Sequence, residues 1–278
     1  MAQEPRTGLV LSLTASFMPG ARVALASFLK TNPWFDGTVL ILTPESALDP
    51  QPLRALWPKL RVELPTHRFS ALAARASPQA ERQLVNLQKG EALRHGDFDR
   101  LIFIDADMIF QRSVEGALLE GSVAAPPDHA WMRGVPRSAL DYRMSNAARD
   151  GALRFSFCCG FMVVNRPALG PDCYETFLDH MARMIGGDLP DGVSEQAIFN
   201  IMYQAEVTPL GPSYNFLVRA PGTMPLGLDD AHIIHFSAIA KPWDLKGAMA
   251  AEQRGGAVAA AYARWRAQWV TLTRGVIA

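Results

Sequence analysis

The sequence lacks an excess of charge of either sign. Its 278 residues contain 27 lysines and arginines against 27 aspartates and glutamates, so the formal net charge is zero. Proteins that bind nucleic acid through bulk charge are usually strongly basic, so we expect no nucleic-acid partner. A local basic patch, facing a membrane surface, is still compatible with this balance.

Cysteine is also scarce. The three cysteines are Cys158, Cys159 and Cys173, and they form neither a Cys-x-x-Cys spacing nor a zinc-type cluster with histidine. Adjacent cysteines rarely pair, so a reducing compartment fits best, and we expect a cytoplasmic protein. Cys158 and Cys159 are interpreted first as core thiols.

Long apolar runs are absent as well. No stretch approaches the roughly 20 apolar residues that a membrane-spanning helix needs. Residues 9–18 follow Arg6 and could suggest a signal peptide, but Ser12, Thr14 and Ser16 interrupt the run. We therefore interpret this region as a first strand, a turn and a first helix.

Hydrophobic residues make up 49% of the chain, enough for a large core in one α/β domain or two small ones. Apolar runs and helical periodicities alternate along the sequence. Strands are expected at 9–14, 38–43, 61–64, 101–104, 123–125, 155–165 and 232–236. Helices are expected at 21–30, 49–60, 81–95, 113–119, 172–185, 194–204 and 247–270, and irregular chain at 66–80 and 129–150. This order predicts an α/β fold with a mostly parallel sheet and helices on both faces.

The stretch 101–110 carries two carboxylates at the end of an apolar run, in the order Asp105-Ala106-Asp107. Burying an unpaired charge is very costly, so both side chains must meet a cation or water. The carboxyl ends of strands in an open α/β sheet are where ligands bind. The pair therefore predicts a divalent metal site in a cleft, and the alternative is a solvated acidic turn.

A metal needs further ligands, and His235 at the end of a late strand is the best candidate. Taken alone, it is more simply a half-buried histidine with its hydrogen bonds satisfied. Lys241 follows six residues later, directly before Pro242 and Trp243. A metal beside a fixed cation suits a diphosphate leaving group.

These residues resemble glycosyltransferase family 8, the glycogenin-like and lipopolysaccharide galactosyltransferase-like retaining enzymes. The family's Asp-x-Asp matches Asp105-Ala106-Asp107, and its His-x5-Lys-Pro-Trp matches His235 and Lys241-Pro242-Trp243. Weaker matches, in the same order along the chain, are Thr14, Lys89, Glu195-Gln196 with Asn200, and Tyr214-Asn215.

The resemblance implies a single Rossmann-like nucleotide-sugar-binding domain of the GT-A type over 1–278. Its catalytic core would span about 9–245 and its C-terminal helix 246–278. It implies transfer of a sugar from a nucleoside diphosphate donor, expected to be UDP-linked, to a glycan or lipid-linked acceptor in polysaccharide biosynthesis. The oligomeric state stays open.

The resemblance also implies roles for individual residues. Asp105, Asp107 and His235 would hold Mn²⁺ or Mg²⁺, and the metal and Lys241 would bind the diphosphate. Glu195 and Gln196 would act at the sugar, with Gln196 near the anomeric carbon. The remaining donor-binding residues would be Thr14, Lys89, Cys158 and Asn215. Without the resemblance, Lys89 is more simply a solvated helix lysine, and Asn200 and Trp243 are packing residues.

The sequence departs from the family at several of these positions. Cys158 stands where an asparagine usually contacts the sugar, and a thiol is a poor hydrogen-bonding group. Ala15 and Ser16 stand where acidic or amide residues contact the base, Glu195 replaces an aspartate, and Ala238 replaces a glycine. Donor specificity is therefore expected to differ from that of relatives which transfer glucose or galactose.

Two other functions fit parts of the pattern. Haloacid-dehalogenase phosphatases also place Asp-x-Asp after an apolar strand, but there the motif opens the chain. A nucleotide-sugar-binding protein without transfer activity would tolerate Cys158 and Ala15. The arginine-rich stretch from Met132 to Arg149 is the candidate acceptor-side loop, and the tryptophans at 265 and 269 are interpreted as packing the last helix, with a membrane-surface role as the alternative.

Overall fold

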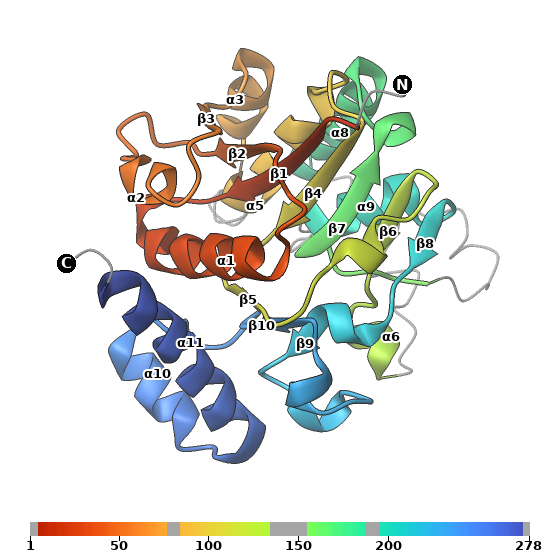
Figure 1. The fold of residues 1–278 in the computed structure, drawn as a ribbon. Helices are drawn as coiled ribbons and strands as arrows, with labels where there is room; N and C mark the ends of the chain where they lie inside the picture. Colours follow the sequence, from red (N-terminus) through yellow and green to blue (C-terminus); the bar gives the residue numbers. More distant parts are fainter. Residues whose placement is uncertain (1–4, 77–83, 134–154, 187–194, 275–278) are drawn as a thin grey trace.

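The computed structural model describes residues 5–76, 84–133, 155–186 and 195–274. A seven-stranded sheet runs through its centre in the order β3-β2-β1-β4-β7-β6-β8 (Figure 1). The strands are β1 Thr7–Ser12, β2 Thr38–Leu42, β3 Leu60–Glu63, β4 Arg100–Ile104, β6 Val123–Ala125, β7 Phe161–Asn165 and β8 Val207–Pro209. Only β7 runs antiparallel to its neighbours, so the predicted mostly parallel α/β sheet is confirmed.

Helices cover both faces of this sheet, because successive strand residues point to opposite sides. On β1, Val10 packs with one apolar cluster, while Leu9 and Leu11 pack with another. The first cluster includes side chains of α8 (Pro171–Ile185) and α9 (Glu195–Tyr203), and the second includes those of α1 (Met18–Thr31) and α2 (Gln51–Arg54). The near-continuous apolar strands are therefore buried on both sides.

A second sheet of three short strands lies beside the first. It consists of β5 (Met108–Phe110), β10 (Ile233–His235) and β9 (Phe216–Leu217), with β10 in the middle. β10 pairs antiparallel with β5 and parallel with β9. Because β5 follows β4 after only the Asp-Ala-Asp turn, this turn joins the two sheets.

The C-terminal region forms two helices, so the prediction of one helix over 247–270 is wrong. α10 (Leu245–Glu252) and α11 (Gly256–Arg274) are separated by a short turn, and Gly255 in this turn and Gly256 at the start of α11 have positive φ values of 69° and 52°. Only glycine adopts this conformation at little cost. Trp265 stacks on Trp269 with ring centroids 5.6 Å apart and packs on Trp243, in agreement with a packing role.

Other boundaries also differ from the sequence-based ones. The expected irregular chain at 66–80 contains α3 (His67–Ala73), whose N-terminus is capped by the Thr66 hydroxyl. The expected helix at 81–95 is a short α5 (Leu84–Leu87) followed by a 3-10 helix, η2 (Gln88–Arg94), and the one at 49–60 contains only the four-residue α2. β7 begins only at Phe161, and 113–119 contains a 3-10 turn rather than an α-helix.

The remaining short elements are α6 His129–Met132 and the 3-10 helices η1 Ala15–Phe17, η3 Glu115–Ala117, η4 Arg166–Ala168, η5 Pro212–Asn215, η6 Pro221–Thr223 and η7 Leu228–Asp230. The arginine-rich candidate acceptor loop lies almost entirely outside the described residues. Across the described ranges, no helix combines the length and the apolar character needed to cross a membrane.

Candidate active site

Strand pairing brings together three residues that lie far apart in the sequence. Asp105 and Asp107 occupy the turn between β4 and β5, and His235 ends β10, where it pairs with Met108 of β5. The backbone fixes the turn, because Asp105 N donates to Gly160 O over 2.8 Å and the amide after His235 donates to Asp107 O over 2.9 Å. The register of β5 and β10 therefore sets the imidazole beside the carboxylates.

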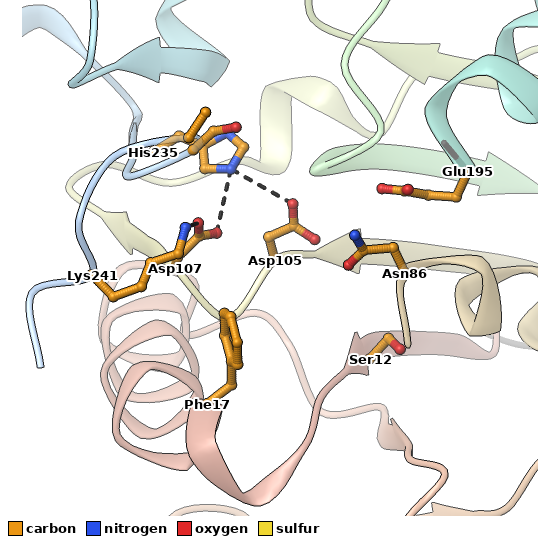
Figure 2. A pocket seen from close by; sticks show the side chains of 11 residues that line it. Ser12, Phe17, Asn86, Asp105, Asp107, Glu195, His235 and Lys241 are labelled. Carbon is orange, nitrogen blue, oxygen red and sulfur yellow. Dashed lines mark hydrogen bonds and ion pairs between the residues drawn. The ribbon is translucent and has the colours of Figure 1, made fainter. Parts of the chain in front are cut away.

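The side chains form an alternating row of charges, of which Asp105, His235, Asp107 and Lys241 can be followed in Figure 2. His235 Nε2 lies 3.3 Å from Asp107 Oδ1 and 3.6 Å from Asp105 Oδ2. The other oxygen of each carboxylate contacts a lysine: Lys89 Nζ lies 2.5 Å from Asp105 Oδ1, and Lys241 Nζ lies 2.6 Å from Asp107 Oδ2. Each carboxylate is thus held between the histidine and its own lysine.

The neighbouring charges shift the pKa values of His235, Asp105 and Asp107. Burial disfavours the charge on His235, but Asp107 and Asp105 outweigh burial and hold the pKa of His235 well above its ordinary value. Burial likewise opposes ionisation of Asp107 and Asp105, but the neighbouring cations keep both of their pKa values below the ordinary range. A cation that binds at Nε2 must replace the proton there, so its affinity is expected to rise with pH.

The triad fits a divalent cation chemically. One ligand atom from each of Asp105, Asp107 and His235 can be chosen so that all lie within 4.8 Å of one another. Carboxylate oxygens suit Mg²⁺ and Mn²⁺, and an imidazole nitrogen adds affinity for transition metals. Gly160 leaves the space open, because a Cβ atom there would lie 2.8 Å from Asp105 Oδ2.

A cavity of about 240 Å³ opens onto these groups. Its described lining consists of Ser12, Phe17, Asn86, Asp105, Ala106, Asp107, Glu195, His235, Ser237, Ala238 and Lys241 (Figure 2). Five of the predicted site residues are in this lining: both aspartates, Glu195, His235 and Lys241. Ala238 has a φ of 52°, a left-handed conformation that favours glycine.

Other predicted residues lie behind or beside the cavity. Lys89 is almost fully buried, with its ammonium between Asp105 and Glu195, and not a solvated helix lysine. Asn215 is fully buried behind the His235 ring. Cys158 is buried, and its sulfur accepts a hydrogen bond from Gly160 N over 3.4 Å.

Thr14 and Gln196, two of the predicted donor-site residues, form hydrogen bonds away from the triad. The Thr14 hydroxyl lies 2.9 Å from the Ser16 hydroxyl, and Gln196 Nε2 donates to Asp128 Oδ2 over 3.4 Å. Neither is part of the described cavity lining. Asn200 is a packing residue, as expected without the resemblance, because its side-chain amide bonds both the backbone N–H and the C=O of Phe157.

Glu195 has one carboxylate oxygen that bonds its neighbours and one that does not. Its Oε1 lies 3.6 Å from Lys89 Nζ and accepts a weak hydrogen bond from the Cys159 thiol over 3.4 Å. The residue lines the cavity, and its Oε2 is buried and has no hydrogen-bond partner in the described part of the chain. A buried oxygen of this kind is costly unless a ligand or water satisfies it.

Sequence reasoning missed Ser12, Phe17, Asn86 and Ser237 among the lining residues. Ser12 and Phe17 flank the end of the first strand, where ligands of α/β folds bind, and this position was the available signal. Phe17 also makes an edge contact with Trp243, with ring centroids 5.4 Å apart, so the Lys-Pro-Trp segment supports the cavity wall.

Comparisons with known proteins identify the family and support the fold. The model of glycosyl transferase family 8 matches residues 8–247. The galactosyltransferase LgtC, solved with donor and acceptor sugar analogs, has a similar fold with a TM-score of 0.67 at 13% identity, and the match covers 96% of each chain. No protein of curated function matches the sequence.

Two further solved structures share the fold. The bifunctional glycosyltransferase WbbM matches with a TM-score of 0.59 at 16% identity, over 87% of this chain and 48% of that one. Mouse xyloside xylosyltransferase 1 matches with a TM-score of 0.52 at 15% identity, over 84% and 98%. With the family model spanning most of its length, the chain belongs to glycosyl transferase family 8 and is a glycosyltransferase of the GT-A fold.

Proposed function

We propose that this enzyme transfers a hexosyl group with retention of configuration from a nucleoside diphosphate sugar, with Mn²⁺ or Mg²⁺ held by Asp105, Asp107 and His235. The observation that carries the proposal is the convergence of this triad and Lys241 on one cavity. UDP is the proposed nucleotide carrier. We also propose that 1–278 forms one domain.

The charges of the site favour an anionic leaving group. Three cationic side chains, Lys89, His235 and Lys241, face three carboxylates, Asp105, Asp107 and Glu195. A divalent cation that replaces the proton on His235 adds one positive charge to this balanced set. Bound there, the metal would neutralise charge that develops on the diphosphate as it leaves.

Lys241 is the residue of this chain that would bind the diphosphate directly. Its ammonium donates to Asp107 Oδ2 over 2.6 Å and to the Phe236 carbonyl over 2.9 Å. These two bonds hold the ammonium at the cavity, beside the triad. A fixed donor at a developing negative charge stabilises the transition state without reorganisation. Pro242 limits the backbone freedom next to this lysine.

The sugar half of the site lies at the other end of the cavity. Glu195, with its unpartnered Oε2, is proposed to accept hydrogen bonds from sugar hydroxyls, and Gln196 to approach the anomeric carbon. Lys89 would hold Asp105 and Glu195 in place, while Thr14 and Cys158 would border the donor. Since a thiol replaces an amide at Cys158, the preferred sugar is proposed to make few polar contacts there.

The acceptor is proposed to be a saccharide or a lipid-linked glycan at the cytoplasmic face of a membrane. Among the described residues, Leu245 and Met249 are the most exposed large apolar side chains, at 76% and 67%. They lie four residues apart on α10, on one face of the helix. We propose that this face makes the peripheral contact with the bilayer.

The test is a thermal-shift screen of nucleotide sugars with and without Mn²⁺, followed by a turnover assay with the best donor. A donor should raise the melting temperature only with the metal, and Asp107→Asn should abolish the shift. Asp229→Asn, an exposed substitution outside the site, is the control. Metal-dependent donor hydrolysis retained by both Asp105→Ala and Asp107→Ala would exclude the metal site, and donor binding without transfer to any acceptor would identify a binding protein.

A further inference from the structure

The side chain of Asn215 is fully buried, and both ends of its amide are bonded. Its Nδ2 donates to the Pro127 carbonyl over 3.1 Å. Its Oδ1 lies 2.8 Å from His235 Nδ1. The orientation of the amide follows from these partners, because the reversed amide would set its oxygen against the carbonyl of Pro127, and two acceptors would face each other.

The amide oxygen can only accept, so Nδ1 of His235 must carry a hydrogen. In the neutral ring the lone pair is then on Nε2, the nitrogen that faces Asp105 and Asp107. We propose that Asn215 is a positioning residue that fixes the metal-binding tautomer and the ring orientation of His235. The inference rests on the proposed metal site and deepens it.

The Pro127 carbonyl, which accepts the hydrogen bond from Asn215 Nδ2, is itself rigidly held. Pro127 forms a β-bridge with Phe157, and the side chain of Asn200 bonds both backbone groups of Phe157. Two buried asparagines therefore tie the segment at Pro127 to α9 on one side and to the His235 ring on the other. Rotation of the Asn215 amide would break its bonds to both Pro127 and His235.

Direct contact between Asn215 and a donor sugar fits the geometry less well. The residue has no exposed surface and is absent from the described lining of the cavity. The His235 ring lies between its amide and the carboxylates. Asn215 can therefore orient the imidazole of His235, but it cannot touch the substrate.

Two substitutions separate this role from simple packing. Asn215→Leu removes both the donor to Pro127 and the acceptor for His235, whereas Asn215→Asp removes only the donor. Both should lower the melting temperature. Free Mn²⁺ measured by electron paramagnetic resonance should show binding weakened about 10–100-fold in Asn215→Leu, and within about tenfold of wild type in Asn215→Asp.

The control is Asn165→Leu, which removes another buried asparagine whose amide bonds Arg100, Leu119 and Gly121. It should lower the melting temperature but leave Mn²⁺ affinity unchanged. An Asn215→Leu protein that folds and binds Mn²⁺ like wild type would overturn the inference. Failure of wild type itself to bind Mn²⁺ would instead overturn the proposed function.

A second measurement decides the question if Asn215→Leu does not fold. Nitrogen-15 spectra of histidine-labelled wild type with saturating Mg²⁺ should show a protonated Nδ1 for His235, assigned by its absence in His235→Gln. A protonated Nε2 in the metal-bound protein would overturn the inference. Asn215→Asp should keep the wild-type pattern.

Discussion

Gly160 lies so close to His235 that a Cβ atom on it would be 2.7 Å from Cε1 of the ring. The same atom would lie 2.8 Å from Asp105 Oδ2 and 2.9 Å from the Met108 side chain. These separations are well inside van der Waals contact. Strand pairing holds the backbones of His235 and Met108, and a hydrogen bond from Asp105 N to Gly160 O holds that of Asp105. The glycine that interrupts the Cys158 to Phe161 stretch therefore creates room for the triad.

We expect Gly160→Ala to displace the imidazole or the Asp105 carboxylate and to weaken Mn²⁺ binding at least about tenfold, since metal affinity depends on ligand geometry. Isothermal titration of Mn²⁺ measures this directly. Gly222→Ala is the matched control, because a Cβ at Gly222 meets nothing within 4 Å. Equal Mn²⁺ affinity in the two variants would show that the site tolerates the methyl group.

The sequence predicted the metal triad but not the reason for its geometry. Asp105 and Asp107 directly follow an apolar strand, and His235 ends a later one, so the residue types and the strand ends indicated these three residues, and the resemblance then supported them together with Lys241. The pairing of β10 with β5, which brings His235 to the turn, spans well over a hundred residues and leaves little local trace. Local sequence likewise gives no sign of the contacts of Asn215, because its partners Pro127 and His235 lie 88 and 20 residues away.

A tertiary contact explains one error in the predicted secondary structure, the single helix expected over 81–95. Leu84, Leu87 and Leu93 suggested one helix, but Gly90 is pressed so closely against Phe177 that a Cβ there would lie 2.1 Å from the ring. The chain takes the tighter 3-10 form at this contact. Tertiary packing overrides helix propensity here, and the sequence alone carries no record of the partner.

Lys241→Met should separate donor binding from metal binding. Removing the ammonium takes a cation away from the developing charge on the diphosphate, and we expect turnover to fall about 10²–10³-fold. Mn²⁺ affinity should stay the same or increase, because Asp107 loses a competing cation. Steady-state kinetics and Mn²⁺ titration test the two effects, with the exposed Lys246→Met as control. A parallel loss of metal affinity would mean that Lys241 shapes the metal site instead.

The proposed membrane contact of α10 can be tested with a double substitution that leaves the fold intact. Leu245→Ser combined with Met249→Ser should leave the melting temperature nearly unchanged, because both side chains are exposed. Binding to vesicles that contain anionic lipid, measured by sedimentation, should fall at least about a hundredfold if both side chains are fully buried in the bilayer, since each contributes about 1.5–3 kcal/mol. Val270→Ser on α11 is the control. Unchanged sedimentation of the double variant would place the contact elsewhere.

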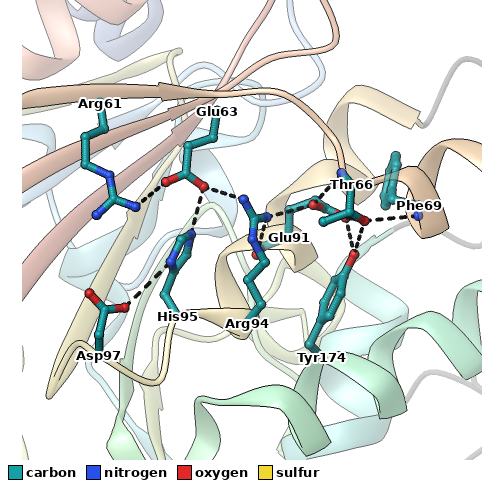
Figure 3. Close-up of polar contacts among 9 residues, drawn as sticks. All are labelled: Arg61, Glu63, Thr66, Phe69, Glu91, Arg94, His95, Asp97 and Tyr174. Atoms are coloured by element: carbon teal, nitrogen blue, oxygen red, sulfur yellow. Dashed lines mark hydrogen bonds and ion pairs between the residues drawn. The ribbon is translucent and has the colours of Figure 1, made fainter.

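Acid should destabilise the protein through Glu63 at the end of β3. Its carboxylate contacts Arg61 at 2.5 Å, Arg94 at 2.5 Å and His95 at 2.8 Å (Figure 3). Burial raises the pKa of Glu63, but His95 and the two arginines outweigh burial and lower it from 4.5 to about 2. The network ties β3 to η2, the 3-10 helix that carries Lys89.

A carboxyl whose pKa is depressed in the folded state stabilises the fold above its unfolded pKa and loses this contribution as the pH falls through the folded one. The lowering of the Glu63 pKa corresponds to about 3–4 kcal/mol at most. Solvent screening at Arg61, which is 48% exposed, lowers our expectation to about 1–3 kcal/mol. Urea unfolding should therefore show wild type losing this stability between about pH 4.5 and 2 relative to Glu63→Gln. Parallel curves for the two proteins over this interval would show that other carboxylates cause the acid sensitivity.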